Sequence, residues 1–255
     1  MDVRVLGAAT PDPFLSAADL FETEYDLEWP VRVRVRDDPD ERTWAGHYED
    51  YHVLNISRQA ATSVMARELA LHEFAHMARY EESHPSHVQS TEEALFLALP
   101  GKSVERRKLI HCYQIANHMK DIYADDITLS LTSATKLLTF LESQLAAAVA
   151  DKPSGEADGP SRRRLTAASD PEMTAVNAAF ALALVERHGL AGRDHPLYDF
   201  AGLAADDAPG IDVEAFKRRF TSLADDPTKS DYRKALVDVT RAYADPPRGS
   251  GPAAD

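Results

Sequence analysis

The stretch that decides the fold reads Leu71-His72-Glu73-Phe74-Ala75-His76-Met77, within a helix-favouring run from about residue 60 to residue 82. Its two histidines are four residues apart, so they lie one turn apart on one helix face and can reach the same metal ion. Glu73 projects beside them, where its carboxylate could take a proton from a metal-bound water. Apolar neighbours can bury the rest of the helix. The sequence therefore predicts a metal-binding helix at the centre of the fold.

The bulk composition indicates a globular and acidic protein. The chain has 255 residues, is 44% hydrophobic and carries a net charge of −14. This negative charge argues against a nucleic-acid partner, because proteins that bind nucleic acids need a basic surface. Aspartate outnumbers glutamate and arginine outnumbers lysine, a balance that resembles proteins of salt-loving archaea. An ordinary acidic cytosolic protein is the alternative.

The cellular compartment follows from cysteine usage and from the distribution of apolar residues. The single cysteine, Cys112, excludes an internal disulfide and fits a reducing compartment. No apolar run has the length of a membrane span or of a signal sequence. We therefore expect a cytoplasmic protein with no membrane partner; the sequence does not indicate its oligomeric state.

Three extended segments precede the metal-binding helix. Valines alternate with arginines from Val31 to Arg36, which is typical of a half-buried strand. The arginines are expected to face solvent, with an anionic substrate site as the alternative. Further strands are expected from about Thr43 to His47 and from Tyr51 to Ser57. The last one leads directly into the helix, so it could line the cleft as an edge strand that pairs with a peptide, or lie inside the sheet.

The residues after the helix offer further candidates. His84 and His87 have side chains that can bind metals, but they stand in a polar loop broken by proline, so we expect both to be exposed to solvent. Ser90 and Glu93 match a capping box at the start of the next helix. This structural role for Glu93 competes with a role as metal ligand.

A second informative helix begins near Ser103 and runs past Tyr123. Its polar residues fall within about a quarter-turn of the helical wheel: His111, Gln114, His118, Asp121 and Asp125. This stripe is expected to form the other wall of the metal site. By residue type, His111, His118 and Tyr123 are candidate donors to the oxyanion of a tetrahedral intermediate.

These two helices carry a resemblance to a known family. His72-Glu73-x-x-His76 after a strand resembles the zincin metallopeptidases, particularly their compact gluzincin-like forms. The segment Asp121-Ile122-Tyr123-Ala124-Asp125 is similar to the acidic pattern that supplies their third ligand, with aspartate in place of the leading glutamate. The resemblance implies that Asp121 binds zinc and that Asp125 supports a ligand histidine.

The third ligand has alternatives, because aspartate is shorter than glutamate by one methylene. They are Glu93, Asp125 and His118, and Glu93-Ala94-Leu95 resembles the ligand helix of other zincins. Manganese or iron could replace zinc as the resident metal. The complete chain also looks like an uncharacterised group of haloarchaeal proteins.

The resemblance implies a zinc-dependent peptidase that acts on a peptide or protein substrate, with Glu73 as general base. Two other functions remain. A zinc-binding interaction or regulatory protein without peptidase activity would close the site with a fourth protein ligand, such as Asp125 or His118. A metal-dependent hydrolase of a non-peptide amide would have a closed pocket instead of a groove along a strand.

The expected fold is α+β and predominantly helical, with a small N-terminal sheet packed on the metal-binding helix. The metallopeptidase domain is expected at 1–150 and a linker rich in proline and glycine at 151–165. A helical C-terminal domain or lid follows at 166–244. The tail at 245–255 is expected to be disordered.

Overall fold

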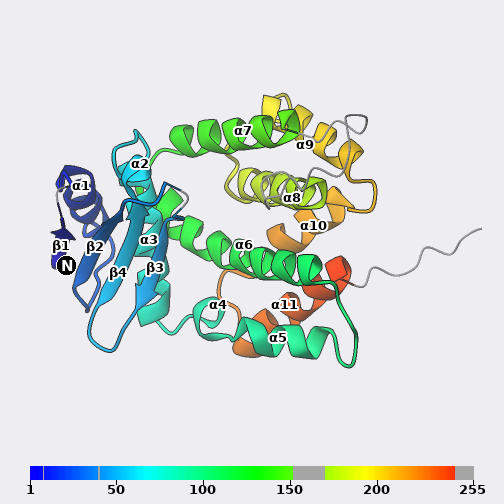
Figure 1. Ribbon diagram of the computed structural model, residues 1–255, viewed down its shortest axis with the longest axis horizontal. Coiled ribbons are helices and arrows are strands. Elements are labelled where there is room, and N and C mark those ends of the chain that lie inside the picture. Colours follow the sequence, from blue (N-terminus) through cyan, green and yellow to red (C-terminus); the bar gives the residue numbers. More distant parts are fainter. Residues whose placement is uncertain (8, 40, 152–169, 245–255) are drawn as a thin grey trace, which may run out of the picture. The chain divides into compact units, whose positions relative to one another are not determined.

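A computed structural model describes residues 1–7, 9–39, 41–151 and 170–244 of the chain (Figure 1). It confirms a mostly helical α+β protein with a small N-terminal sheet. The described chain forms two compact units, and these interleave along the sequence instead of following one another as consecutive blocks. The first unit comprises Met1–Val88 and Lys120–Lys136, and the second comprises Gln89–Met119 and the residues from Leu137 onwards. The expected linker, apart from Asp151, and the expected tail lie outside the described residues.

The first unit is built on a four-stranded sheet with the order β1-β2-β4-β3. Strands β1 (Val3–Leu6), β2 (Val31–Arg36) and β4 (His52–Ser57) are parallel, and β3 (Trp44–His47) is antiparallel to β4. Strand β4 therefore lies inside the sheet, so the Tyr51–Ser57 segment has no free edge. The free edge next to it belongs to β3. The first strand was not predicted, although Val3 and Val5 alternate with polar residues just as the valines of β2 do.

Two helices pack on the sheet and bury its valines. They are α1 (Asp12–Phe21) and α3 (Ala66–Glu81), and their core includes Phe14, Phe21, Val31, Val33, Leu54, Ile56, Leu71 and Phe74, all fully buried. The arginines of β2 alternate with these valines and are only partly buried or exposed, as predicted. Because Leu71 and Phe74 anchor α3 in the core, the polar residues of the same helix are held on its opposite side.

Short elements complete the first unit. Helix α2 (Arg58–Ala61) begins directly after β4, where Ser57 caps it by accepting a hydrogen bond from the N–H of Ala60. Helix α4 (Pro85–Val88) is a single turn after α3. The long helix α6 (Arg106–Leu131) contributes its C-terminal half, and there Ala124 and Ile127 join the core.

The second unit consists of helices. They are α5 (Thr91–Ala98), the N-terminal half of α6, α7 (Thr135–Ala150) after its first turn, α8 (Pro171–His188), α9 (Pro196–Asp207), α10 (Val213–Thr221) and α11 (Lys229–Ala244). Helix α8 begins at the Asp170-Pro171 step and ends at Gly189, whose φ of 61° lies in the left-handed region that favours glycine. Cys112 is fully buried in α6, and burial raises the pKa of its thiol to about 11, so little reactive thiolate forms at neutral pH.

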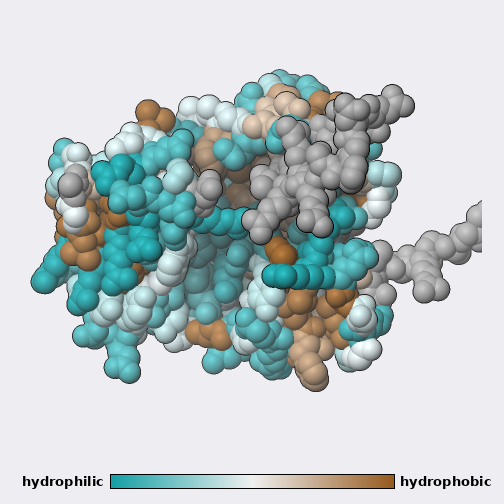
Figure 2. Space-filling model, in the orientation of Figure 1, coloured by the Kyte–Doolittle hydropathy of each residue, from teal (hydrophilic) through white to brown (hydrophobic). Residues whose placement is uncertain are grey.

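The surface agrees with the acidic and polar composition. On the face shown in Figure 2, hydrophilic residues predominate over the sheet, and hydrophobic residues gather in smaller separate areas. Among the helices that the structure describes, none combines the length and the apolar character needed to cross a membrane.

Candidate metal centre

Helix α3 carries three candidate residues on its polar side. His72 and His76 are partly buried, and Glu73 is 5% exposed. The Nε2 atoms of the two histidines lie 3.1 Å apart. Both imidazoles therefore converge on one point beside the helix, as their spacing of four residues predicts.

Asp121 of α6 lies beside these two nitrogens. Its Oδ1 is 3.3 Å from Nε2 of His76 and 3.8 Å from Nε2 of His72. These three residues form one of two groups, among the described residues, whose ligand atoms all lie close enough together to hold a metal ion. Aspartate reaches the histidines despite its short side chain, because α6 brings it close to α3.

The spacing of the three atoms fits a tetrahedral metal ion. Zinc bonds of about 2.0–2.1 Å place neighbouring ligand atoms about 3.3 Å apart. The separations of 3.1, 3.3 and 3.8 Å scatter around that value. Two imidazole nitrogens and one carboxylate oxygen also form a typical donor set of catalytic zinc. The residues therefore fit a zinc ion with three protein ligands.

Asp125 orients His72. It stands one turn after Asp121 on α6, is 4% exposed, and its Oδ1 lies 2.8 Å from Nδ1 of His72. An ionised carboxylate only accepts hydrogen bonds, so Nδ1 of His72 carries the hydrogen and, in the neutral ring, Nε2 carries the lone pair. Burial lowers the pKa of His72, but Asp125 and Asp121 outweigh burial and raise it well above its ordinary value. The same negative field favours a metal cation at Nε2.

A chain of hydrogen bonds from α4 orients His76. Nδ1 of His76 lies 2.8 Å from Nε2 of His87, and Nδ1 of His87 lies 2.7 Å from Oγ of Ser86. The same Oγ lies 2.7 Å from Nδ1 of His84. Burial lowers the pKa of His87 well below its ordinary value, and the charges of His76 and Lys120 lower it further. His87 is therefore a neutral imidazole.

The backbone determines where the hydrogens of this chain lie. The N–H of Ser86 donates to Nδ1 of His84 at 3.3 Å, so that nitrogen has no hydrogen and the Ser86 hydroxyl donates to it as well. The hydroxyl oxygen then accepts from Nδ1 of His87, which leaves the lone pair of His87 on Nε2. Nε2 of His87 accepts from Nδ1 of His76. The lone pair of His76 is consequently on Nε2, the atom that faces Asp121.

Glu73 has the environment of a general base. Its burial raises the pKa of its carboxyl above the ordinary value, although the nearby histidines act in the opposite direction. The backbone N–H of Ala45, on the edge strand β3, donates a hydrogen bond to this carboxylate. A carboxylate with a raised pKa accepts a proton more readily at neutral pH. Glu73 therefore lies between the two histidines of α3 and the edge strand β3.

The other candidate ligands lie in the second unit and have other partners there. The carboxylate of Glu93 is exposed and lies 3.4 Å from Arg233, while the N–H of Glu93 bonds to the capping Ser90. Nε2 of His118 lies 2.8 Å from the side-chain oxygen of Asn177, and its ring stacks on Phe180. Neither belongs to the group formed by His72, His76 and Asp121.

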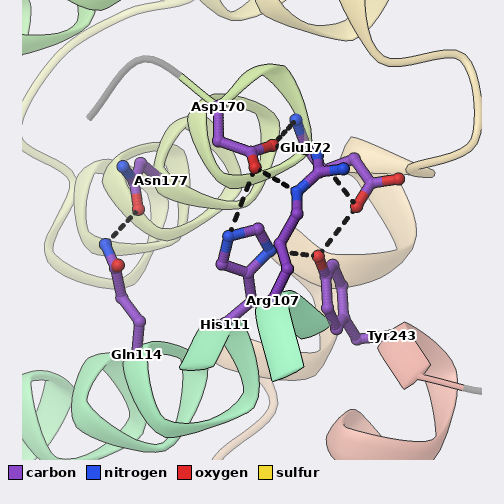
Figure 3. A network of polar contacts seen from close by, with 7 residues as sticks. All are labelled: Arg107, His111, Gln114, Asp170, Glu172, Asn177 and Tyr243. Atoms are coloured by element: carbon purple, nitrogen blue, oxygen red, sulfur yellow. Dashed lines mark hydrogen bonds and ion pairs between the residues drawn. The ribbon is translucent and has the colours of Figure 1, made fainter. Parts of the chain in front are cut away.

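His111 belongs to a second polar network, which Figure 3 shows. The network joins α6 to the start of α8 and to α11. Arg107 bonds to both carboxylate oxygens of Asp170, and Nε2 of His111 lies 3.4 Å from Asp170. The hydroxyl of Tyr243 bonds to Nδ1 of His111 and to Glu172. Although His111, Asp170 and Glu172 could reach one ion, Arg107 already supplies the positive charge, so we interpret this network as structural.

Some of the functional side chains were not predicted. The expectation that His84 and His87 face solvent is wrong, because His84 is 7% exposed and His87 contacts a candidate ligand. Their loop folds back as α4, and only tertiary contacts place it against α3. Tyr123, a candidate oxyanion donor, is fully buried, and its ring contacts that of His84 at an interplanar angle of 50°. Two histidines in one short loop after the motif were the available signal.

Comparison with known proteins adds a family but no activity. Neither the curated proteins nor the solved structures contain a match to this chain. A family model matches residues 1–245. The chain belongs to a family of unknown function, DUF5781.

Proposed function

We propose that this protein is a zinc-dependent peptidase that hydrolyses peptide bonds. The observation that carries the proposal is the convergence of two histidine nitrogens and one carboxylate oxygen within 3.1–3.8 Å of one another. Hydrogen bonds to Asp125 and His87 direct the lone pairs of His72 and His76 toward that point. A metal site that only stabilises the fold needs no buried general base beside it, whereas a hydrolytic site does.

The number of protein ligands supports catalysis over a structural metal. A structural zinc site has four protein ligands, and a catalytic site leaves one position for water. In the described part of the chain, Asp125 bonds to Nδ1 of His72 and His118 bonds to Asn177. Both candidates for a fourth ligand are therefore engaged elsewhere, which favours a peptidase over a zinc-binding interaction protein.

Glu73 is assigned the proton transfers of the hydrolysis. A bound zinc ion supplies a positive charge that polarises the substrate carbonyl and lowers the pKa of its water to about 7. Glu73 accepts a proton from the attacking water as the new C–O bond forms. It then delivers this proton to the leaving nitrogen as the C–N bond breaks, so that the products are a carboxylate and an amine. The N–H of Ala45 holds the Glu73 carboxylate in place for both transfers.

The free edge of β3 favours an extended peptide as substrate. Antiparallel pairs alternate between hydrogen-bonded and non-bonded residues, and the N–H of Tyr48 bonds to the carbonyl of Tyr51. By this alternation, the backbone groups of Ala45 and His47 point away from β4. Ala45 is also the residue that contacts Glu73. A peptide that pairs with this edge would place its carbonyls beside the general base.

A cleavage assay tests the proposal. Zinc-loaded wild-type protein and Glu73→Gln are each incubated with a mixed peptide library, and new peptide termini are identified by mass spectrometry. We expect cleavage by the wild type and a loss of about 10²–10⁴-fold in Glu73→Gln, which is the usual contribution of a general base. Equal cleavage by both proteins, or none by a zinc-loaded wild type, would refute the proposal.

A further inference from the structure

A pair of histidines faces each other across the edge of the sheet. His47 on β3 is paired with His52 on β4, and their Nδ1 atoms lie 3.0 Å apart. In the antiparallel alternation of β3 and β4 this pair is a non-bonded one, in which side chains approach more closely. His52 is fully buried, whereas His47 is half-buried.

Glu81 determines the hydrogen positions of this pair. Its carboxylate accepts the N–H groups of Glu28 at 2.8 Å and Trp29 at 2.9 Å, and it lies 2.9 Å from Nε2 of His52. A carboxylate with these partners is an acceptor, so Nε2 of His52 donates to it. Burial lowers the pKa of His52, although Glu81 acts in the opposite direction, so the ring is neutral and its Nδ1 has no hydrogen. Nδ1 of His47 therefore donates to His52.

The remaining nitrogen of His47 carries a lone pair and has no hydrogen-bond partner in the described chain. The pKa of His47 is lowered to about 4, first by burial and then by the electrostatic effect of the nearby basic side chains of His52, His76 and Lys120. At neutral pH the ring is thus uncharged, and Nε2 acts only as an acceptor. A bound molecule or water can supply the donor.

His47 lies close to residues of the candidate metal centre. Its ring stacks on Tyr80, with centroids 3.9 Å apart and an interplanar angle of 6°. Tyr80 stands one turn after His76 on the same face of α3, which corresponds to a rise of about 6 Å. Two residues before His47, the N–H of Ala45 contacts Glu73. The acceptor thus lies on the strand that borders both a candidate ligand and the general base.

We propose that Nε2 of His47 is a substrate-binding acceptor of this site, which receives an N–H group of the bound substrate. The inference rests on the proposed function and narrows its substrate class to compounds with an N–H beside the cleaved bond, such as peptides. Because Nε2 cannot donate in this tautomer, His47 does not stabilise an oxyanion. Esters and carboxylates, which lack this N–H, gain nothing from His47.

Two hydroxamates test this assignment on the zinc-loaded full chain. Acetohydroxamate, N-methylated so that it has no N–H of its own, offers only a metal-binding group, whereas a tripeptide hydroxamate with the same N-methyl group adds backbone N–H groups beside it. The variant His47→Phe keeps an aromatic ring on Tyr80 but removes the acceptor, and Tyr48→Phe is the matched control on the neighbouring residue. We expect His47→Phe to bind the tripeptide hydroxamate about tenfold more weakly than the wild type does, with acetohydroxamate affinity unchanged.

Two results would overturn the inference. One is equal affinity of His47→Phe and the wild type for the tripeptide hydroxamate. The other is an equal loss of affinity for both hydroxamates, which would mean that His47→Phe disturbs metal binding. If the wild type binds neither hydroxamate, the proposed function fails and the inference falls with it. Nitrogen NMR of the wild type gives a check that needs no variant: we expect neutral His47 with its hydrogen on Nδ1, and a hydrogen on Nε2 would contradict the assignment.

Discussion

Nδ1 of His72 lies 2.8 Å from Oδ1 of Asp125. An acidic residue of α6 thereby decides which nitrogen of an α3 histidine faces Asp121. The two aspartates of α6 therefore have different roles. The Oδ1 atom of Asp121 faces the position of the metal, whereas the Oδ1 atom of Asp125 accepts a hydrogen bond from His72.

Asp125→Asn should weaken zinc binding without abolishing it. An asparagine that turns its NH₂ toward Nδ1 of His72 would favour the tautomer whose Nε2 carries the hydrogen. Loss of such a supporting partner typically costs 10–100-fold in metal affinity. Competition with a chromophoric zinc chelator measures the change, and Asp126→Asn is the control on the adjacent residue. Unchanged affinity in Asp125→Asn would contradict the orienting role.

His87→Ala should also reduce zinc affinity by about 10–100-fold, because His76 loses the acceptor that holds its Nδ1 hydrogen. Val88→Ala, on the exposed side of the same turn, should bind zinc as the wild type does. The same chelator competition compares the two variants. If both lower the affinity alike, the effect comes from the stability of α4 and not from the hydrogen bond.

Glu73→Gln should separate metal binding from catalysis. Glutamine keeps the size of the side chain and can still accept the N–H of Ala45, but it cannot take a proton from water. We expect zinc affinity within about threefold of the wild type, together with a loss of about 10²–10⁴-fold in kcat. A Glu73→Gln protein that loses its zinc would instead place Glu73 among the ligands.

Asp170→Asn should destabilise the protein through the second unit. Asparagine caps a helix about as well as aspartate, so the change isolates the loss of the ion pair with Arg107. We expect a decrease of about 2 kcal/mol in the free energy of unfolding at pH 7. Urea denaturation measures it, with the exposed Asp206→Asn as control. A change no larger than in the control would show that the network contributes little.

The same pair makes stability depend on pH. Burial raises the pKa of Asp170, but Arg107 and His111 outweigh it, so the folded pKa lies below the ordinary value of 3.8. The contribution of Asp170 is therefore present above about pH 3.8 and is lost as the pH falls through the lower folded value. Below that range, wild type and Asp170→Asn should converge in stability. A difference that persists there would exclude the charge of Asp170 as its source.

Local patterns predicted much of the fold. The valine alternation of β2 and the helix spacing of His72 and His76 both depend on neighbours in sequence, and the structure contains both elements. The position of β4 inside the sheet was open, because strand order depends on long-range pairing that a single segment does not encode.

Some residues of the candidate site could likewise be found from local sequence, and others could not. Residues at helical spacing, such as Asp121 and Asp125, could be related to the motif from the sequence alone. His47, His52 and His87 could not, because strand pairing and the return of a short loop bring them to α3. Nothing in the local sequence of His47 or His52 distinguishes them from exposed histidines.

Zinc stoichiometry is the most direct test of the account. Wild type, His76→Ala and Glu73→Gln are dialysed to equilibrium against buffered zinc in high salt, and bound metal is measured by atomic emission after folding is checked by circular dichroism. We predict about one zinc per chain in the wild type and in Glu73→Gln, and a large loss in His76→Ala. Equal zinc content in all three folded proteins, whether one or none, would contradict a metal centre built on His72, His76 and Asp121.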